Sequence, residues 1–401
     1  MEALCLNAFL RPASFSCEVF FAVGKSYVRG EMFVIGTVMG RFKRVCRGFL
    51  DRMGKNFWLT AYPHFLSIAV IDDCNYRCQY CFGSFFSKEH CGRKEKSLSN
   101  LIGLNVFKAL IDDLAGFGKP IKIYFNYGGS IMWGEPFLHP DIMAMLAYVR
   151  AKGFSFSVLT NGSLIHPKMA EKIIDLGVEN ICVSLNAANP KTYSEVTQSP
   201  PEFFPKACDA VASLVGRKRM LGRFLSKISI SMVLNTFAYK EVLNFLRLGR
   251  RLGVDCVSYR KLAYCEQNKR RINFLLLNEG QKKELSGLLL EVIAMERSHS
   301  GLQTNARQIL NSMIKGELEK PMTFRRQPES MRDHSVILGD GTVYAMNYSE
   351  PMGNVNDSTF PDIWSSEKYL RLRKNASRIA ADLFPCYPYC RGCGAVPNVG
   401  N

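Results

Sequence analysis

Between residues 66 and 262, short β-rich runs alternate with runs whose apolar residues recur at a helical period. The expected strands are residues 66–71, 121–127, 154–159, 180–185, 228–234 and 254–262. The expected helices between them are residues 101–115, 141–151, 167–176, 205–215 and 240–252. Strands separated by single helices pair in parallel, because a parallel connection needs a crossover of about a dozen residues or more. The alternation therefore predicts an α/β fold built from six parallel βα units.

Two cysteine triplets share the spacing C-x3-C-x2-C, namely Cys74/Cys78/Cys81 and Cys386/Cys390/Cys393. With 14 cysteines in 401 residues, composition alone gives only about 0.02 such matches in the whole chain. Thiolates hold iron–sulfur clusters or zinc, but zinc ligands come more often as two separated pairs. Three thiolates can ligate three irons of a [4Fe–4S] cube and leave the fourth iron open. The alternative for each triplet is a set of buried thiols without a ligand.

Composition bounds the class of protein. A chain of 401 residues that is 47% hydrophobic is long enough for two or three domains and a large core. The net charge of +17 indicates either an anionic partner or simply a basic surface. The remaining cysteines are irregularly spaced, which is not typical of a secreted disulfide framework. We therefore expect a reducing, cytoplasmic location, and no apolar run reaches the roughly 18 residues of a membrane span.

The N-terminal segment has no clear period up to residue 38. It is either a targeting segment or an extension upstream of a working start at Met32 or Met39. From residue 39 the sequence predicts a basic helix with an apolar side, which would pack on the core or touch a membrane surface.

The first triplet, with Tyr80 just before its last cysteine, resembles the motif of radical S-adenosylmethionine (SAM) enzymes. The resemblance implies a (β/α)6 partial TIM barrel whose ligands bind at the C-terminal ends of the strands. It also implies that the triplet holds a SAM-binding [4Fe–4S] cluster. Reductive cleavage of SAM would then give a 5′-deoxyadenosyl radical that abstracts hydrogen from a substrate. Tyr80 would pack near the adenine, or else is an ordinary loop aromatic residue.

A Gly-Gly-Glu-Pro element follows the second strand in that family and contacts the methionine amino group of SAM. This chain has two partial matches, Gly128-Gly129-Ser130 and Gly134-Glu135-Pro136. We favour Gly134, Glu135 and Pro136, because only this match carries a carboxylate that can accept from an ammonium group. In the competing interpretation the contact lies at Gly128-Gly129, and Glu135 only caps the helix that follows.

Polar residues also follow the next strands, where family enzymes often bind the ribose. Residues 160–162 read Thr-Asn-Gly after the third strand. Ser184 is the first candidate for ribose binding, Asn186 the second and Asn235 the third. Each of them is equally plausible as a turn or cap residue.

The C-terminal residues resemble the SPASM/twitch tail of one radical SAM subgroup. The matching stretches are VILGDGTV (336–343), MGNV (352–355), DIWS (362–365) and CYPYCRGC (386–393). Tails with two clusters carry more cysteines, including some near the hairpin, but residues 344–347 contain none. We therefore expect one auxiliary [4Fe–4S] cluster, held by Cys386, Cys390 and Cys393, with Cys265 as a candidate fourth ligand.

These assignments predict four regions. An N-terminal extension covers residues 1–58, a radical SAM core 59–265, a helical linker 266–331 and a small C-terminal β-hairpin and helix iron–sulfur domain 332–401.

The substrate is less determined than the chemistry. Peptide substrates are common in the subgroup, but we expect no leader-binding domain here. A small molecule such as a sugar, nucleotide or cofactor precursor is therefore at least as plausible. The electron donor would be a flavodoxin or ferredoxin. The competing class is a non-catalytic iron–sulfur or zinc protein that binds nucleic acid, but no RNA-binding fingerprint accompanies the positive charge.

Overall fold

The computed structural model describes residues 61–81, 100–126, 134–222, 225–264, 269–270, 272–297, 301–318, 332–346 and 350–379. Within these ranges, no helix combines the length and the apolar character that a membrane span requires.

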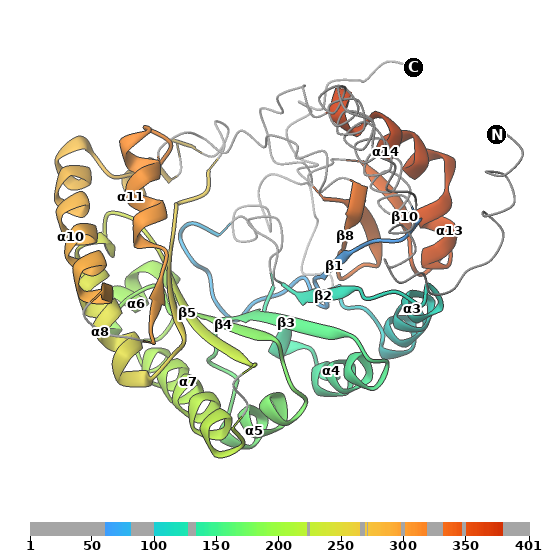
Figure 1. Ribbon diagram of the computed structural model, residues 1–401, viewed down its shortest axis with the longest axis horizontal. Coiled ribbons are helices and arrows are strands. Elements are labelled where there is room, and N and C mark those ends of the chain that lie inside the picture. Colours follow the sequence, from blue (N-terminus) through green and yellow to red (C-terminus); the bar gives the residue numbers. More distant parts are fainter. Residues whose placement is uncertain are drawn as a thin grey trace, which may run out of the picture. The chain divides into compact units, whose positions relative to one another are not determined.

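One ten-stranded sheet, in the order β10-β9-β8-β1-β2-β3-β4-β5-β6-β7, organises the described residues (Figure 1). The strands are β1 Phe65–Ile68, β2 Lys122–Phe125, β3 Ser155–Thr160, β4 Asn180–Ser184, β5 Lys227–Val233, β6 Cys256–Arg260, β7 Gln303–Thr304, β8 His334–Ile337, β9 Thr342–Ala345 and β10 Pro351–Asn354. Neighbours from β1 to β7 pair in parallel. This confirms the predicted α/β class with a partial barrel.

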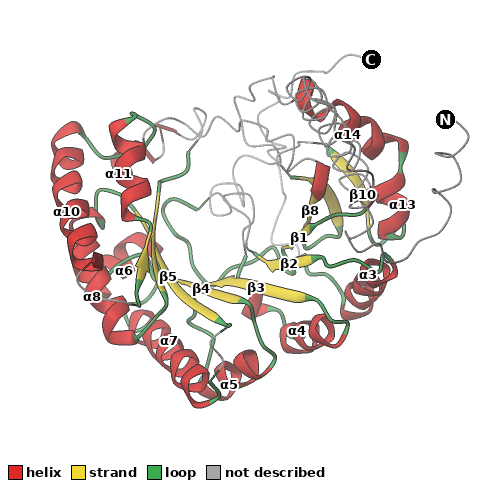
Figure 2. Ribbon diagram, viewed as in Figure 1, coloured by secondary structure: helices red, strands yellow, loops and turns green. Residues whose placement is uncertain are grey.

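Helices connect the strands and cover one side of the sheet. They are α3 Leu104–Gly116, α4 Ile142–Ala151, α5 Pro167–Asp175, α6 Pro190–Thr197, α7 Phe203–Met220, α8 Val242–Leu252, α10 Glu279–Arg297, α11 Ala306–Ile314, α13 Phe360–Ser365 and α14 Glu367–Ile379. Short 3-10 turns form at η1 Pro136–Leu138, η2 Tyr239–Glu241 and η3 Asn273–Leu275. Figure 2 shows α3, α4, α5, α7 and α8 along the outer face of β1–β6.

The hydrophobic core lies between this outer face and the helices. Successive side chains of a strand point to opposite faces, and on β6 it is Val257 and Tyr259 that join the core. The Tyr259 hydroxyl donates to Val242 O of α8 at 2.8 Å, which ties β6 to its helix. Ser258 and Arg260 therefore belong to the opposite, inner face of the sheet.

Before residue 332, the sequence interpretation missed two helices and one strand among the described residues. Both α6 and α11 are short, and α6 reads PKTYSEVT, so its apolar period is weak. It begins instead at a cap, because the Asn189 side chain accepts from Thr192 N at 3.0 Å. The strand β7 has only two residues. The helix expected from residue 101 begins at Leu104, since Leu101 forms a β-bridge with Ile71.

The later segments join the same sheet. The range 266–331, predicted to be a helical linker, contains α10, α11 and β7, and β7 pairs with β6. In the tail, β8, β9 and β10 form an antiparallel meander. The strand β8 pairs in parallel with β1 in the register Phe65↔His334 to Ile68↔Ile337. The tail meander therefore extends the core sheet beyond β1.

Candidate functional site

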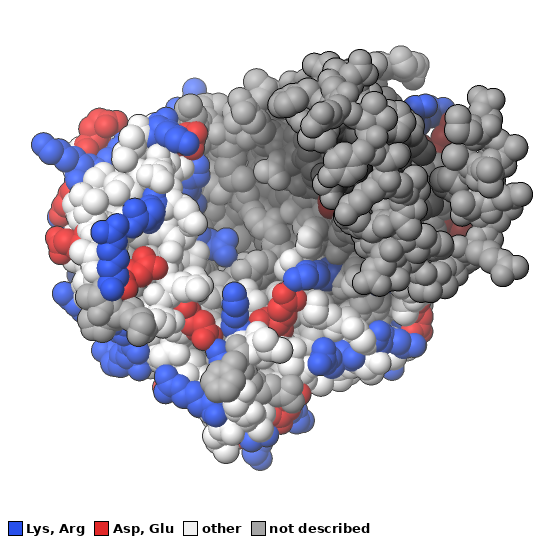
Figure 3. All heavy atoms as spheres, in the orientation of Figure 1, with Lys and Arg blue, Asp and Glu red and all other residues white. Residues whose placement is uncertain are grey.

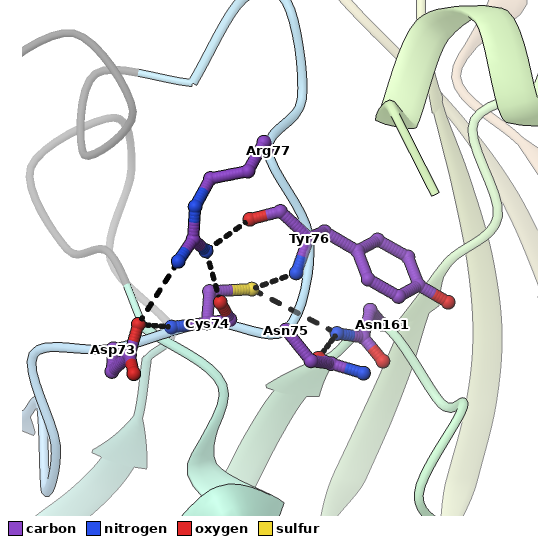
Figure 4. Close-up of polar contacts among 6 residues, drawn as sticks. All are labelled: Asp73, Cys74, Asn75, Tyr76, Arg77 and Asn161. Atoms are coloured by element: carbon purple, nitrogen blue, oxygen red, sulfur yellow. Dashed lines mark hydrogen bonds and ion pairs between the residues drawn. The ribbon is translucent and has the colours of Figure 1, made fainter. Parts of the chain in front are cut away.

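The first cysteine triplet lies on the loop that leaves the carboxyl end of β1. Figure 4 shows its first member, Cys74. Cys74, Cys78 and Cys81 are half-buried free thiols. Burial raises the pKa of Cys74 to about 12, helped by the nearby Glu135 carboxylate. Burial, with the neighbouring Cys81 and Cys74, also raises the pKa of Cys78 well above its usual value. Such thiols keep their protons until a cation displaces them, which is how thiolate ligands couple metal binding to proton release.

The chemistry of the donor set fits an iron–sulfur cluster. A single zinc ion needs its ligands within about 2.0–2.3 Å. A [4Fe–4S] cube instead spreads its thiolates over separate irons. Three thiols on one loop that influence one another electrostatically match the larger group.

Arg77 stabilises the loop through contacts with neighbouring residues of the same loop. Its guanidinium donates to the carbonyl oxygen of Tyr76 at 2.8 Å and to that of Cys74, and it forms an ion pair with Asp73 at 3.6 Å. Asp73 Oδ1 in turn accepts from Cys74 N at 2.8 Å. Figure 4 shows these contacts converging around the first cysteine.

Asn161, which follows β3, reaches the same cysteine. Cys74 Sγ accepts from Tyr76 N at 3.4 Å and from Asn161 Nδ2 at 3.9 Å. Asn161 Nδ2 also donates to Asn75 Oδ1 at 2.8 Å, and Asn75 Nδ2 donates to Ser163 Oγ at 2.9 Å. Donors aimed at a sulfur favour its thiolate form. The Thr-Asn-Gly stretch of residues 160–162 thus supports the cysteine loop.

The C-terminal end of α6 fixes the outer side of the loop. Arg77 N donates to Thr197 O at 3.2 Å, and Gln79 N donates to Val196 O at 3.0 Å. The Gln79 side chain donates to Glu195 O. The last carbonyl groups of a helix have no partner inside it. These hydrogen bonds therefore also supply partners for the C-terminal carbonyl groups of α6. Sequence reasoning missed this contribution, and the Asn189-Pro190 cap was the signal that could have revealed it.

Gly134 brings the Gly-Glu-Pro element directly against the cysteine loop. Its φ is +102°, and a Cβ there would lie 2.1 Å from Ile71 O, so only glycine fits. Glu135 N donates to Asp73 O at 2.7 Å. Asn126 Nδ2, at the end of β2, donates to Gly134 O at 2.6 Å. The element therefore joins the ends of β1, β2 and β3.

The Glu135 carboxylate is buried, with 2% of its surface exposed. It accepts from Phe137 N at 3.1 Å, Thr160 Oγ1 at 2.7 Å and Asn161 N at 2.7 Å. Burial outweighs these donors and raises the pKa of Glu135 to about 7. A carboxylate offers about four acceptor positions, so one remains for a further donor. Glu135 also caps η1, as the competing interpretation expects.

Tyr80 lies on the cysteine loop, directly before Cys81. Its ring packs on a small apolar cluster that includes Leu262, Tyr264 and Ile272. Its hydroxyl is buried and makes no hydrogen bond within the described residues. Burial raises the pKa of Tyr80 well above its usual value.

The three candidates for ribose binding lie at the ends of β4 and β5. Asn186, at φ +60°, donates to Ser184 Oγ at 2.9 Å and accepts from Val233 N at 3.2 Å. Asn235 accepts from Phe237 N at 2.9 Å and donates to Val233 O at 2.8 Å. The side chains of both asparagines thus stabilise the strand ends, whereas Ser184 is half-buried on the inner face.

Several predicted site residues lie outside the described ranges. They are Gly128, Gly129, Cys265, Cys386, Cys390 and Cys393. The tail nevertheless reaches the loop through described residues. Ala69 N donates to Ile337 O at 2.8 Å, and Gly339 N donates to Asp72 Oδ1 at 3.2 Å.

Comparison with known proteins places this architecture in a class. Residues 68–259 match the radical SAM superfamily, and residues 329–394 match the SPASM family, described as an iron–sulfur cluster-binding domain. The chain therefore belongs to the radical SAM superfamily and carries a SPASM C-terminal domain. It is a radical SAM enzyme that uses a [4Fe–4S] cluster with SAM and an auxiliary iron–sulfur cluster.

Three of the similar proteins differ in the molecules that their names mention and in the share of this chain that they match. The tungsten-containing aldehyde ferredoxin oxidoreductase cofactor-modifying protein of Pyrococcus furiosus is 23% identical over 82% of this chain and 86% of its own length. An S-adenosylmethionine-dependent nucleotide dehydratase of Selenomonas ruminantium is 33% identical over 32% of this chain and 40% of its own. The crystal structure of Streptococcus suis SuiB bound to precursor peptide SuiA has a TM-score of 0.54 at 13% identity, covering 88% of this chain and 74% of that one.

Proposed function

We propose that Cys74, Cys78 and Cys81 ligate the cluster at which SAM is reductively cleaved, and that the resulting radical abstracts hydrogen from a small molecule or a peptide. The observation that carries this proposal is the junction of the cysteine loop with Glu135 and Asn161 at the carboxyl ends of β1 and β3. At that junction the loop that carries the three thiols meets a buried carboxylate with one acceptor position left.

The residues of this chain have separable roles in the proposed site. Glu135 accepts the methionine ammonium group through its remaining acceptor position. Gly134 allows the close approach that brings Glu135 to the loop. Tyr80 offers an aromatic ring beside the adenine, and its hydroxyl makes no hydrogen bond within the described residues. Ser184 offers a hydroxyl to the ribose, and Asn186 and Asn235 hold the turns that present it. When bound, the cluster and SAM supply the electron transfer and the radical.

Among substrates we favour a small molecule. The names of the Pyrococcus and Selenomonas proteins refer to a cofactor and a nucleotide, whereas SuiB is bound to a peptide. We further propose that the electron comes from a flavodoxin or ferredoxin in the cytoplasm. The free thiols among the described cysteines agree with such a reducing compartment.

A cysteine variant tests the core assignment. Anaerobically reconstituted protein, reduced by a one-electron chemical reductant such as dithionite, should cleave SAM to 5′-deoxyadenosine and methionine. Cys78→Ala should abolish this, because the loss of one of three thiolates leaves a labile cluster. Cys208→Ala removes another half-buried thiol, on α7, and should cleave SAM as the wild type does. Wild-type cleavage by Cys78→Ala would refute the assignment.

Iron content tests the auxiliary site, which we propose at Cys386, Cys390 and Cys393 within a domain of residues 332–401. The reconstituted chain should hold about eight irons, as two four-iron cubes. Changing these three cysteines to Ala should leave about four irons and preserve the cluster on the first loop. An unchanged iron content would place the auxiliary cluster elsewhere.

A further inference from the structure

Arg260 ends β6 at the carboxyl rim of the barrel. The alternation that sends Val257 and Tyr259 into the core assigns Arg260 to the inner face of the sheet. Its register partner on β5 is Val233. Val233 packs with Tyr80 of the cysteine loop in one apolar cluster. Arg260 therefore lies in the row of residues that faces the candidate site.

Within the described residues, the Arg260 guanidinium has no bonding partner. Its Nε is buried without a hydrogen bond, and no ion pair or side-chain hydrogen bond of Arg260 occurs within the described residues. By contrast, Arg217 makes two hydrogen bonds to the Asp175 carboxylate, at 2.9 and 2.8 Å. A guanidinium carries five N–H donors and is never deprotonated in proteins. The buried Nε leaves one N–H donor of Arg260 without an acceptor, and an anion bound at this position would supply one.

The positions around Arg260 suit a polar ligand. Ser231 and Ser258 are in register on β5 and β6, so they form one row on the inner face. Arg260 follows Ser258 by two residues on the same face. A ligand at the carboxyl rim of the barrel would therefore contact the serine hydroxyl groups of the inner face and the guanidinium group of Arg260. Arginine matches the geometry of carboxylate and phosphate groups in this way.

We propose that Arg260 binds an acidic group, a carboxylate or a phosphate, of the substrate. This inference rests on the proposed radical SAM function and adds the chemical class of the substrate. The competing source of the anion is the carboxylate of SAM itself. The ammonium and carboxylate of SAM share one carbon, and the ammonium is assigned to Glu135, which is bonded to the end of β3. Three strand spacings of about 4.8 Å separate β3 from β6, which favours the substrate.

The test measures anion binding to the SAM-loaded holoenzyme. The probes are inorganic phosphate and acetate, followed by ³¹P and ¹³C line broadening. Arg260→Met keeps much of the alkyl stem and removes the charge. It should fold at least as well as the wild type, because no partner is lost. Both anions should bind about 10- to 100-fold more weakly to this variant, as expected for lost charge-assisted hydrogen bonds.

Two further variants sharpen the result. Lys261→Met removes the next cation along the chain, whose ammonium group donates to Glu317 O at the surface, and should bind both anions as the wild type does. Arg260→Lys keeps the charge without the fork and should show intermediate affinity.

Anion affinity that is equal in Arg260→Met and Lys261→Met would overturn the proposal. A tenfold or greater loss of SAM affinity in Arg260→Met would assign the guanidinium to SAM instead, and would also overturn it. A wild-type holoenzyme that does not cleave SAM would contradict the proposed function, whatever the anions do.

Discussion

At the scale of single residues, a few side chains stabilise the site because nearly all of their polar atoms form hydrogen bonds. The Glu135 carboxylate accepts three hydrogen bonds from protein groups, and Asn161 contacts both Glu135 and Cys74. A hydrogen bond to a charged group is worth about 1.5–3 kcal/mol. Each bond at Glu135 therefore restricts where a further donor, such as an ammonium group, can approach.

The pKa of Glu135 sets the first expectation. Burial raises this pKa to about 7, so the carboxylate form, which accepts an ammonium group, predominates only above that pH. SAM affinity of the wild type should therefore rise with pH through about 7 and then level off. Glu135→Gln should bind SAM roughly 10- to 150-fold more weakly at pH 8 and should lack the rise near pH 7.

The measurement is a titration of SAM against the electron paramagnetic resonance signal of the reduced cluster at several pH values. Asp112→Asn is the matched control, because it neutralises a surface carboxylate that pairs with Lys152 on the outer helices. Equal SAM affinity in Glu135→Gln and Asp112→Asn would instead support the capping role and return the methionine contact to Gly128-Gly129.

At the scale of elements, α6 is the support that the cysteine loop needs. Its N-terminus is anchored by Glu241, which accepts from Ala188 N and from the Asn189 side chain. Its C-terminal carbonyl groups bind Arg77 N and Gln79 N. The helix thus links the start of α8 to the loop after β1.

Removing the α6 cap should loosen the loop. Asn189→Ala should lower the free energy of unfolding by about 1 kcal/mol and speed the loss of iron to a chelator. Thr359→Ala removes the cap of α13, where Thr359 Oγ1 accepts from Asp362 N. This control should cost a similar stability without faster iron loss from the first cluster. Chelator kinetics and denaturant unfolding of both variants separate the two effects, and identical iron-loss rates would rule out the support role.

At the scale of the whole chain, the tail and the core share a sheet. The pairing of β8 with β1 brings the turn after β8 against Asp72, two residues before the first cysteine. The net charge of +17 does not by itself mark a site, because basic and acidic side chains are interspersed over the described part of the face in Figure 3.

A substitution at Gly339 tests the packing of the tail against the cysteine loop. A Cβ at Gly339 would lie 2.4 Å from Asn100 O and 3.0 Å from Asp72 Oδ1. Gly339→Ala should therefore destabilise the holoenzyme by about 1–3 kcal/mol, as overpacking does. Gly216→Ala, in α7 with no atom within 4 Å of the added Cβ, should instead stabilise it by about 0.5–1 kcal/mol. Denaturant unfolding measures both, and stabilisation by Gly339→Ala would show that the turn is loosely packed.

The sequence by itself determined the local chemistry and the fold class. The spacing of Cys74, Cys78 and Cys81 and the alternation of strands with helices are properties of neighbouring residues, so a pattern along the chain reveals them. Tertiary structure alone decided the contacts between distant segments. Such contacts include Asn161 at Cys74, 87 positions apart, and Gly339 at Asp72, 267 positions apart. The packing of the strands also decided that Arg260, on the inner face, has no bonding partner among the residues that the structure describes. Side-chain burial depends on which strands become neighbours, and no local period encodes that choice.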